Sequence, residues 1–117
     1  AQVIDDKGAM HAVLWISERY PLAAYDLESL DEDGKKIYIE VKATQSADPS
    51  DPFPISAQEL EAARVHGSRH WLYRVTRIDA PDPGIVKVRD PHAVLQRGEA
   101  VIHPTKYQMR IGLQGWV

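Results

Sequence analysis

The stretch Ile37-Tyr-Ile-Glu-Val-Lys42 decides the fold, because its apolar and polar residues alternate strictly. Alternation with a period of two is typical of a strand that buries one face. Residues 23–30 alternate in the same way, and the turn between the two runs, residues 31–35, is rich in Asp and Gly. Two alternating runs around such a turn predict a β-hairpin.

The faces of this hairpin follow from parity, because side chains alternate sides along a strand. One face is predicted to form the core and carries Tyr25, Leu27, Ile37, Ile39 and Val41. The other face carries Asp26, Glu28, Tyr38, Glu40 and Lys42. A register that pairs Leu30 with Lys36 places Asp26 opposite Glu40, with Cβ atoms ~5 Å apart. Two carboxylates at that distance repel unless a cation lies between them.

The hairpin is flanked by helical patterns. Residues 8–20 have apolar residues at helical spacing, and Pro21 ends the helix that they predict. After a Pro-, Asp- and Ser-rich loop at 46–54, Ser56 and Glu59 form a capping box that starts a second helix. This helix is expected to end near His66, with Gly67 after it.

The rest of the chain predicts strands at 70–78 and 85–88, a short helix from Asp90-Pro91 to Gly98, and a last strand at 107–111. This order predicts an α/β fold in which a mixed central sheet is flanked by helices.

Size and composition indicate one soluble globular domain spanning 1–117, with 44% hydrophobic and 26% charged residues. The absence of cysteine excludes disulfides and Cys-based zinc sites and fits a reducing cytoplasm. Because the chain begins with Ala1, we expect a fragment of a larger protein. The net charge of −3 is divided unevenly: residues 1–58 hold 5 Lys/Arg and 11 Asp/Glu, whereas residues 59–117 hold 9 and 6. The basic half is suited to face an anion, although ordinary surface scatter gives the same pattern.

The polar face of the hairpin carries residues suited to metal-ion chemistry. The carboxylates of Asp26 and Glu40, with the backbone carbonyl of Val41, are oxygen ligands of the kind that Mg²⁺ or Mn²⁺ takes. Such an ion polarises a phosphoryl oxygen and generates a nucleophile from water, and Lys42 is placed to orient that water or to stabilise developing charge. The alternative is an ordinary solvated face, which is common on hairpins.

A wider series of motifs resembles a known family. In order along the chain these are Tyr-Asp-Leu-Glu-Ser at 25–29, Ile-Glu-Val-Lys at 39–42, Gln58-Glu59, Leu-Tyr-Arg-Val at 72–75 and Arg-Asp-Pro at 89–91. Over roughly residues 8–91 the chain resembles the family named for the carboxy-terminal domain of the plant protein NO VEIN. That family resembles the restriction-endonuclease-like PD-(D/E)XK nucleases and is often joined to helicases, ATPases and restriction or phage-defence proteins.

The resemblance implies a restriction-endonuclease-like fold in which Asp26 and Glu40 are metal ligands and Lys42 is the catalytic lysine. The chain departs from the superfamily pattern on the first helix, where Ala9, Met10 or His11 stands near the position of a further acidic residue. Ala24 and Ala43 replace glycines that the family often carries beside the motifs.

Side chains that could contact nucleic acid lie outside this trio. Gln45 and Ser46 follow the lysine, Arg64 and Arg69 lie near the end of the second helix, and Arg74 lies on the next strand. Phosphate contacts of this kind position a nucleic acid without reading its sequence. For each of these residues an ordinary surface role is the alternative.

Two functions remain open at this point. The first is a Mg²⁺- or Mn²⁺-dependent nuclease domain that hydrolyses DNA within a restriction, phage-defence or DNA-processing protein, with a homodimer as one way to cut both strands. The second is an inactive relative that binds nucleic acid or other domains of a larger helicase or ATPase. An unrelated interaction domain with a solvated hairpin face is the third alternative.

Overall fold

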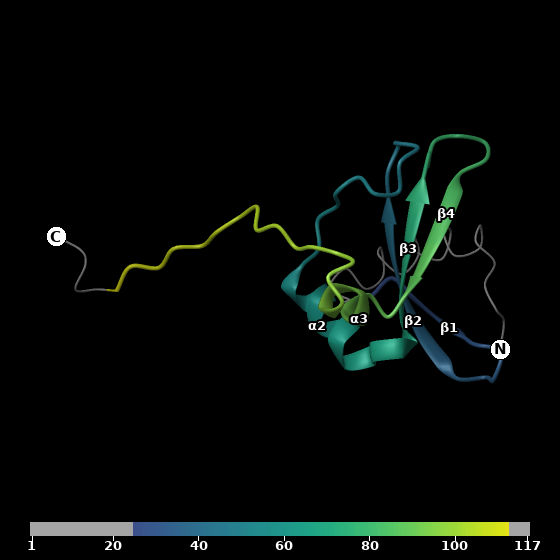
Figure 1. The fold of residues 1–117 in the computed structure, drawn as a ribbon, viewed down its shortest axis with the longest axis horizontal. Helices are drawn as coiled ribbons and strands as arrows, with labels where there is room; N and C mark the ends of the chain where they lie inside the picture. The colour runs from purple at the N-terminus through teal and green to yellow at the C-terminus, as the bar shows by residue number, and fades with distance from the viewer. Residues whose placement is uncertain (1–24, 113–117) are drawn as a thin grey trace.

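The computed structural model describes residues 25–112, so the predicted helix 8–20 lies outside the described residues. Four strands form one mixed sheet in the order β1-β2-β3-β4 (Figure 1). Their bounds are Leu27–Leu30, Lys36–Ala43, His70–Thr76 and Gly84–Arg89. β2 pairs in parallel with β3, and the pairs β1–β2 and β3–β4 are antiparallel. The prediction of an α/β fold with a mixed sheet is confirmed.

Helical segments connect and flank the strands. Helix α2 (Ala57–His66) and the short 3₁₀ helix η1 (Gly67–Arg69) form the crossover between the parallel strands β2 and β3. Helix α3 (Pro91–Gln96) follows β4 and lies beside α2 on the same side of the sheet (Figure 1). The crossover is needed because a parallel neighbour cannot be reached by a tight turn.

The hairpin has the predicted register, with Leu30 paired to Lys36 and Leu27 paired to Ile39. The face that carries Ile39 forms an apolar cluster around Leu27, Ile39 and Tyr73, which are at most 7% exposed. Partly buried hydrophobic residues pack against this cluster, namely Ile37, Val41, Trp71 and Ile85. The core face of β1 and β2 is therefore the predicted one from Leu27 onward.

Tyr25 does not join this core, so its predicted placement is wrong. Its ring contacts Tyr38 and His66 edge-on, and its hydroxyl donates to Glu28 Oε1 at 2.6 Å. The physical reason is that β1 begins at Leu27, and the chain bends at Tyr25 and Asp26, where the parity of a strand no longer applies.

The first turn of α2 is fixed by the predicted capping box. Ser56 Oγ accepts from the Glu59 N–H at 3.1 Å, and Glu59 Oε1 accepts from the Ser56 N–H at 2.8 Å. At the other end, Gly67 takes a positive φ of 54° and its N–H donates to the Ala63 carbonyl. Both predicted ends of this helix are confirmed.

The predicted strand 70–78 ends earlier, at Thr76, because Arg77 takes a φ of 48° that interrupts the extended backbone. The predicted strand 85–88 is longer by one residue at each end. The short helix begins after Asp90, whose side chain accepts from the Ala93 N–H, and its Pro91 stands at the first position as expected. The loop at 46–54 is confirmed and contains no strand.

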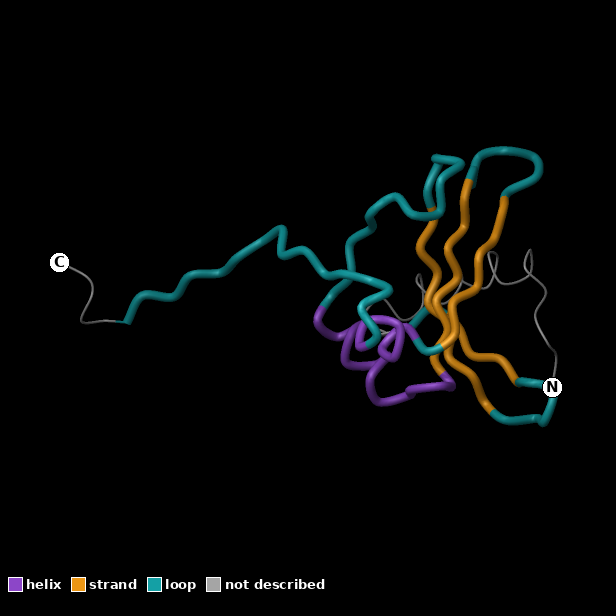
Figure 2. The backbone as a smooth tube through the Cα atoms, viewed as in Figure 1, coloured by secondary structure: helices purple, strands orange, loops and turns teal. Residues whose placement is uncertain are grey.

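The predicted strand at 107–111 is wrong. Residues 101–112 have neither helix nor strand and are exposed, and Figure 2 shows them extending away from the sheet as a loop. Tyr107 and Met109 are 81% and 87% exposed. Alternation alone is insufficient for a strand, since a strand also needs a neighbour for its backbone hydrogen bonds.

Replacing Ser56 with alanine removes the cap and is expected to lower the free energy of unfolding by about 1 kcal/mol. Chemical denaturation of Ser56→Ala measures this loss, with Ser68→Ala as an exposed control on η1. Equal stabilities for the two variants would contradict a stabilising role for the cap.

Candidate functional site

The polar face of β2 is covered rather than solvated. Glu40, in the middle of the strand, is 1% exposed, and the side chain of Lys42 is 17% exposed. Helix α2 reaches this face at both ends, through the Lys42–Glu59 ion pair and through the His66 ring stacked on Tyr38. The alternative of an ordinary solvated face is therefore wrong for Glu40.

Lys42 joins β2 to the first turn of α2. Its Nζ lies 2.9 and 3.1 Å from the two carboxylate oxygens of Glu59 and 3.5 Å from Glu40 Oε1. Because Glu59 also closes the capping box, one carboxylate fixes both the helix start and the lysine. From the sequence Glu59 was expected to cap its helix, and a functional role for it rested on the family resemblance alone.

Glu40 is a buried carboxyl group that accepts no hydrogen bond. As a carboxylate it has no hydrogen-bond partner among the described residues, although the Lys42 ammonium lies 3.5 Å from its Oε1; when protonated it is a donor beside the Glu59 carboxylate. Burial, and then the neighbouring carboxylate of Glu59, raises the pKa of Glu40 to about 9, although Lys42 acts in the opposite direction. Burial also acts on Glu59, but its interactions with the Glu40 carboxyl group, the Ser56 N–H and Lys42 outweigh it and lower the pKa of Glu59 to about 2. The proton is thus held by Glu40 and the negative charge by Glu59.

Asp26 lies next to β2, and its carboxylate accepts a hydrogen bond from the backbone of that strand. Its Oδ2 accepts from the Val41 N–H at 2.6 Å, and its own N–H donates to the Ile39 carbonyl at 2.9 Å. Burial raises the pKa of Asp26 despite that hydrogen bond. The strand ladder starts one residue later, so Asp26 caps the end of the hairpin ladder instead of continuing it opposite Glu40.

His70, at the start of β3, completes the surroundings of Glu40. It is fully buried, its Nε2 has no hydrogen-bond partner, and that atom lies 3.9 Å from Glu40 Oε2. Its Nδ1 lies 3.2 Å from Nδ1 of His66 on α2. The sequence signal for these two residues is the H-x3-H spacing of His66 and His70, one that zinc sites use, and sequence reasoning missed it. Gly67 ends α2 between them, and the pairing of β3 with β2 brings His70 beside Glu40.

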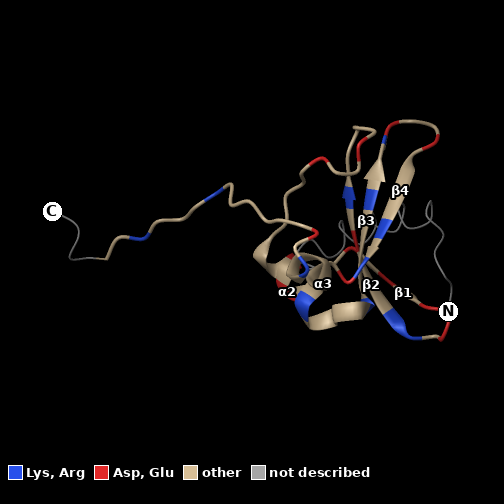
Figure 3. Ribbon diagram, viewed as in Figure 1, with Lys and Arg blue, Asp and Glu red and all other residues tan. Residues whose placement is uncertain are grey.

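Four of the residues predicted to contact nucleic acid lie apart from this site. Gln45 donates to Asp79 at 2.6 Å, and Ser46 Oγ accepts from the Asp48 N–H. Arg64 pairs with Glu61 on the exposed side of α2, and Arg69 donates to the Lys36 carbonyl. Figure 3 shows Lys and Arg on the strands, on α2 and in the C-terminal segment, interspersed with Asp and Glu. A nucleic-acid contact at these four residues stays a prediction.

Arg74 has a structural position. It is 3% exposed, and its Nε, Nη1 and Nη2 donate to the carbonyls of Pro49, Lys42 and Asp51. Its guanidinium also lies over the Phe53 ring, 4.9 Å from the centroid. Arg74 therefore fastens the loop at 46–54 to the sheet, and a guanidinium engaged in this way is not displayed to a phosphate.

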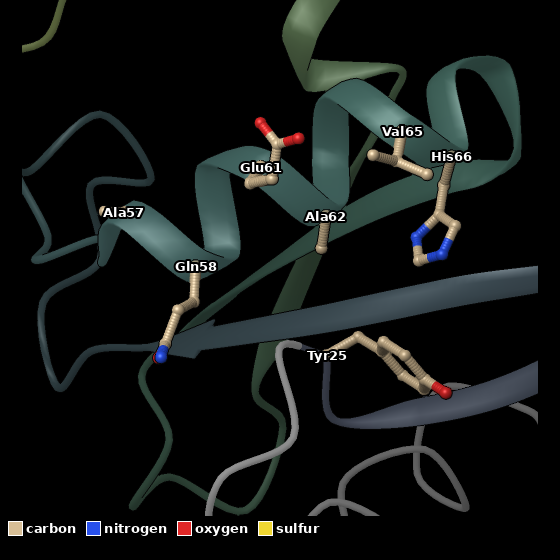
Figure 4. A pocket seen from close by; sticks show the side chains of 7 residues that line it. All are labelled: Tyr25, Ala57, Gln58, Glu61, Ala62, Val65 and His66. Carbon is tan, nitrogen blue, oxygen red and sulfur yellow. The ribbon is translucent and has the colours of Figure 1, made fainter.

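A shallow hollow lies between α2 and Tyr25 (Figure 4). Its volume is about 480 Å³, and it is lined by Tyr25, Ala57, Gln58, Glu61, Ala62, Val65 and His66. Glu40 and Lys42 do not line it, but the hollow adjoins the polar face of β2 through Tyr25 and His66, whose rings contact Tyr38.

The described residues meet only part of what a divalent cation requires. Within residues 25–112 no three Asp, Glu or His side chains form a group that could hold a metal ion. Glu40 nevertheless offers buried carboxylate oxygens that accept no hydrogen bond. The next residue on β2, Val41, has a backbone carbonyl that is a further oxygen ligand for a cation. A buried carboxyl group in this state gains a strong partner when a cation binds.

The raised pKa of Glu40 makes stability depend on pH. Between about pH 4.5 and pH 9 the folded protein keeps a proton that the unfolded chain releases, so stability falls as pH rises through that range. Glu59 acts with the opposite sign, but only as pH falls from about 4.5 towards 2. Each pKa unit corresponds to about 1.4 kcal/mol.

We therefore expect the metal-free protein to lose stability from pH 7 to pH 9, and Glu40→Gln to remove most of that loss. Denaturation with chelator present, at several pH values, measures it. Glu61→Gln, on the exposed side of α2, is the matched control and should follow the unsubstituted protein. A flat pH profile before substitution would show that Glu40 is already ionised in the fold.

Arg74→Lys cannot reproduce three hydrogen bonds from one planar group, so we expect it to destabilise the fold by about 1.5–3 kcal/mol. Hydrogen exchange of amides in residues 46–54 should accelerate in this variant. Arg77→Lys is the control, since Arg77 makes one long bond, 3.4 Å, to the Asp82 carbonyl. Unchanged exchange in Arg74→Lys would contradict the fastening role.

Searches of the curated proteins and of the solved structures gave no match. In the described part of the chain, no helix has the length and apolar character needed to cross a membrane. The family model for the C-terminal domain of protein NO VEIN matches residues 2–88, which is well over half of the chain and includes β1 to β3 and most of β4. The chain therefore belongs to the NO VEIN C-terminal family.

Proposed function

We propose that this chain is a divalent-metal-dependent nuclease domain that hydrolyses phosphodiester bonds in DNA. The observation that carries the proposal is the buried carboxyl group of Glu40, which accepts no hydrogen bond and has only the Lys42 ammonium, at 3.5 Å, as a cationic neighbour on the same face of β2. A buried carboxyl group that accepts no hydrogen bond is a costly arrangement unless it has a ligand or a chemical role. Membership of the NO VEIN C-terminal family supports the proposal, because the matched region, residues 2–88, includes Glu40 and Lys42.

The proposed fold is the restriction-endonuclease-like fold of the PD-(D/E)XK nucleases. Its support is the arrangement in which a hairpin, β1–β2, leads through α2 to a parallel strand, β3. This topology places Glu40 and Lys42 on β2, an inner strand of the sheet, where strand geometry holds side chains rigidly, and Asp26 directly before the edge strand β1.

In the proposed mechanism Glu40 would hold Mg²⁺ or Mn²⁺, and Asp26 and the Val41 carbonyl would supply further oxygen ligands. The bound cation would polarise the phosphate and generate the nucleophile from water. Lys42 would donate to the attacking water or to a phosphate oxygen. Glu59 holds Lys42 at 2.9 Å and so sets the position of its Nζ. Asp26 has to share its carboxylate between a cation and the Val41 N–H.

We further propose that the domain works in the cytoplasm as part of a larger restriction, phage-defence or DNA-processing protein. Its partners would be DNA, the other domains of that protein and, for cutting both strands, a second copy of the chain. The contacts made by Gln45, Ser46, Arg64 and Arg69 to other groups of the chain are mostly exposed, which leaves these residues accessible to a DNA backbone.

The second candidate function is a module of the same fold that binds nucleic acid or a protein without cleaving it. The specific observation in its favour is that Lys42 and Asp26 are already engaged, Lys42 by both oxygens of Glu59 and Asp26 by the Val41 N–H. Such pairs stabilise a fold without any catalysis. The two functions share the site and differ in whether Lys42 reaches a phosphate.

The test is cleavage of supercoiled plasmid and of single-stranded DNA in Mg²⁺ and in Mn²⁺. We expect Glu40→Gln to abolish cleavage and Lys42→Met to reduce its rate by about 100-fold or more. Lys36→Met, on the same strand but 55% exposed and paired with Glu28, is the matched control and should cleave normally.

Cleavage that persists in Glu40→Gln would overturn the proposed site. DNA binding that weakens with salt, together with no cleavage in either cation, would instead favour the binding module.

A further inference from the structure

The described residues contain two fully buried polar side chains that face each other without a hydrogen bond. Glu40 and His70 are 1% and 0% exposed. Both carboxylate oxygens of Glu40 and Nε2 of His70 have no hydrogen-bond partner. The gap of 3.9 Å between Oε2 and Nε2 is too long for a direct hydrogen bond.

The other nitrogen of His70 has a partner. Its Nδ1 lies 3.2 Å from Nδ1 of His66, so one of the two imidazoles donates to the other. If His70 donates, its Nε2 carries no proton and points a lone pair at the carboxyl group of Glu40. Histidines that bind metal ions almost always donate their second ring N–H in this way, which fixes the tautomer and the ring orientation.

The acceptor of that hydrogen bond is itself held in place. The His66 ring stacks on Tyr38, with centroids 3.7 Å apart and planes 8° apart, and Tyr25 contacts it edge-on. Helix α2, strand β2 and strand β3 therefore combine to aim one nitrogen and one carboxylate at the same point. The stacked His66 ring thus fixes the orientation of His70, as the outer partners of metal-binding histidines do.

We propose that Glu40 and His70 together bind a divalent transition-metal ion, with His66 as the residue that orients His70. Two metal–ligand bonds of about 2.1 Å each subtend the 3.9 Å separation at an angle of roughly 135°, so one ion reaches both atoms, and a small approach of the two side chains gives the tetrahedral angle. The described residues supply no third Asp, Glu or His, so the remaining positions would need water or substrate oxygens. Lys42 approaches the other carboxylate oxygen, Oε1, which leaves Oε2 to the ion.

The nitrogen ligand decides the class of metal. Mg²⁺ takes oxygen ligands almost exclusively, whereas imidazole with a carboxylate suits Mn²⁺ and, more strongly, Zn²⁺. The inference rests on the proposed function in so far as the proposed nuclease site also uses Glu40, and it changes the preferred ion of that site from Mg²⁺ to Mn²⁺ or Zn²⁺. His70 would then be a metal ligand that the Asp26, Glu40 and Lys42 series does not include.

The test uses the unsubstituted chain first. Long-range ¹H–¹⁵N spectra of the imidazole rings, recorded during a Zn²⁺ titration, report which nitrogen binds the ion. The expected result is a large shift of His70 Nε2, a smaller change at His66 and none at the exposed His103. No Zn²⁺ binding, or binding that leaves the His70 resonances unchanged, overturns the inference.

Calorimetry of variants gives an independent measurement. His70→Gln is expected to weaken Zn²⁺ and Mn²⁺ binding by about tenfold or more and to change Mg²⁺ binding much less. His103→Gln is the matched control and should bind like the unsubstituted chain. Equal losses for all three ions in a folded His70→Gln variant would overturn the selectivity.

These outcomes separate the inference from the proposed function. If DNA is cleaved in Mg²⁺ while the His70 resonances do not change with Zn²⁺, the inference is wrong and the proposed nuclease function is supported. If His70 binds Zn²⁺ but no cation supports cleavage, the nuclease fails and the metal site stands.

Discussion

The interaction on which the rest of the structure depends is the ion pair between Lys42 and Glu59 beneath the first turn of α2. Two carboxyl groups, Glu40 and Glu59, share one ammonium group there, and the ammonium lies closer to Glu59. Because Glu59 also caps its own helix, the start of α2 is fixed on strand β2. The crossover then delivers His66 and His70 to the far side of Glu40.

This arrangement explains why a strand with an open, charged pattern has a buried middle. Burial forces the two carboxyl groups apart in pKa, so that one stays protonated near neutral pH and the other stays charged. Burying a carboxyl group that accepts no hydrogen bond lowers the stability of the fold. A cation that binds Glu40 would offset that loss, and this is the physical link between the fold and the proposed phosphodiester chemistry. A site that is complete only with its ion and substrate would also account for the engaged states of Asp26 and Lys42.

Local sequence signals predicted the local structure well. The alternation in 37–42 and the turn at 31–35 determined the register of the hairpin, because one slip of a residue would exchange its two faces. The capping box and Gly67 determined both ends of α2. The prediction failed where a partner far along the chain decides the outcome. Residues 107–111 alternate but have no neighbouring strand within the described part of the chain, and Tyr25 lies beyond the end of β1.

The candidate site was predictable only in part for the same reason. Glu40 and Lys42 could be found because they lie two apart on one strand. Glu59 and His70 come from a helix and from the following strand, and only the parallel pairing of β2 with β3 places His70 beside Glu40. Arg74 shows the reverse case, because a basic residue on a strand looks like a phosphate contact until its donors are seen to hold a loop.

The most direct test of the central claim is a crystal structure of the chain grown with Mn²⁺, with anomalous diffraction used to locate the ion. The account predicts an anomalous peak within bonding distance of the Glu40 carboxylate, with α2 covering β2 and Lys42 still next to Glu59. Glu40 turned out into solvent, or a buried Glu40 with no manganese at saturating concentration, would contradict the claim that this face of the sheet is a cation site.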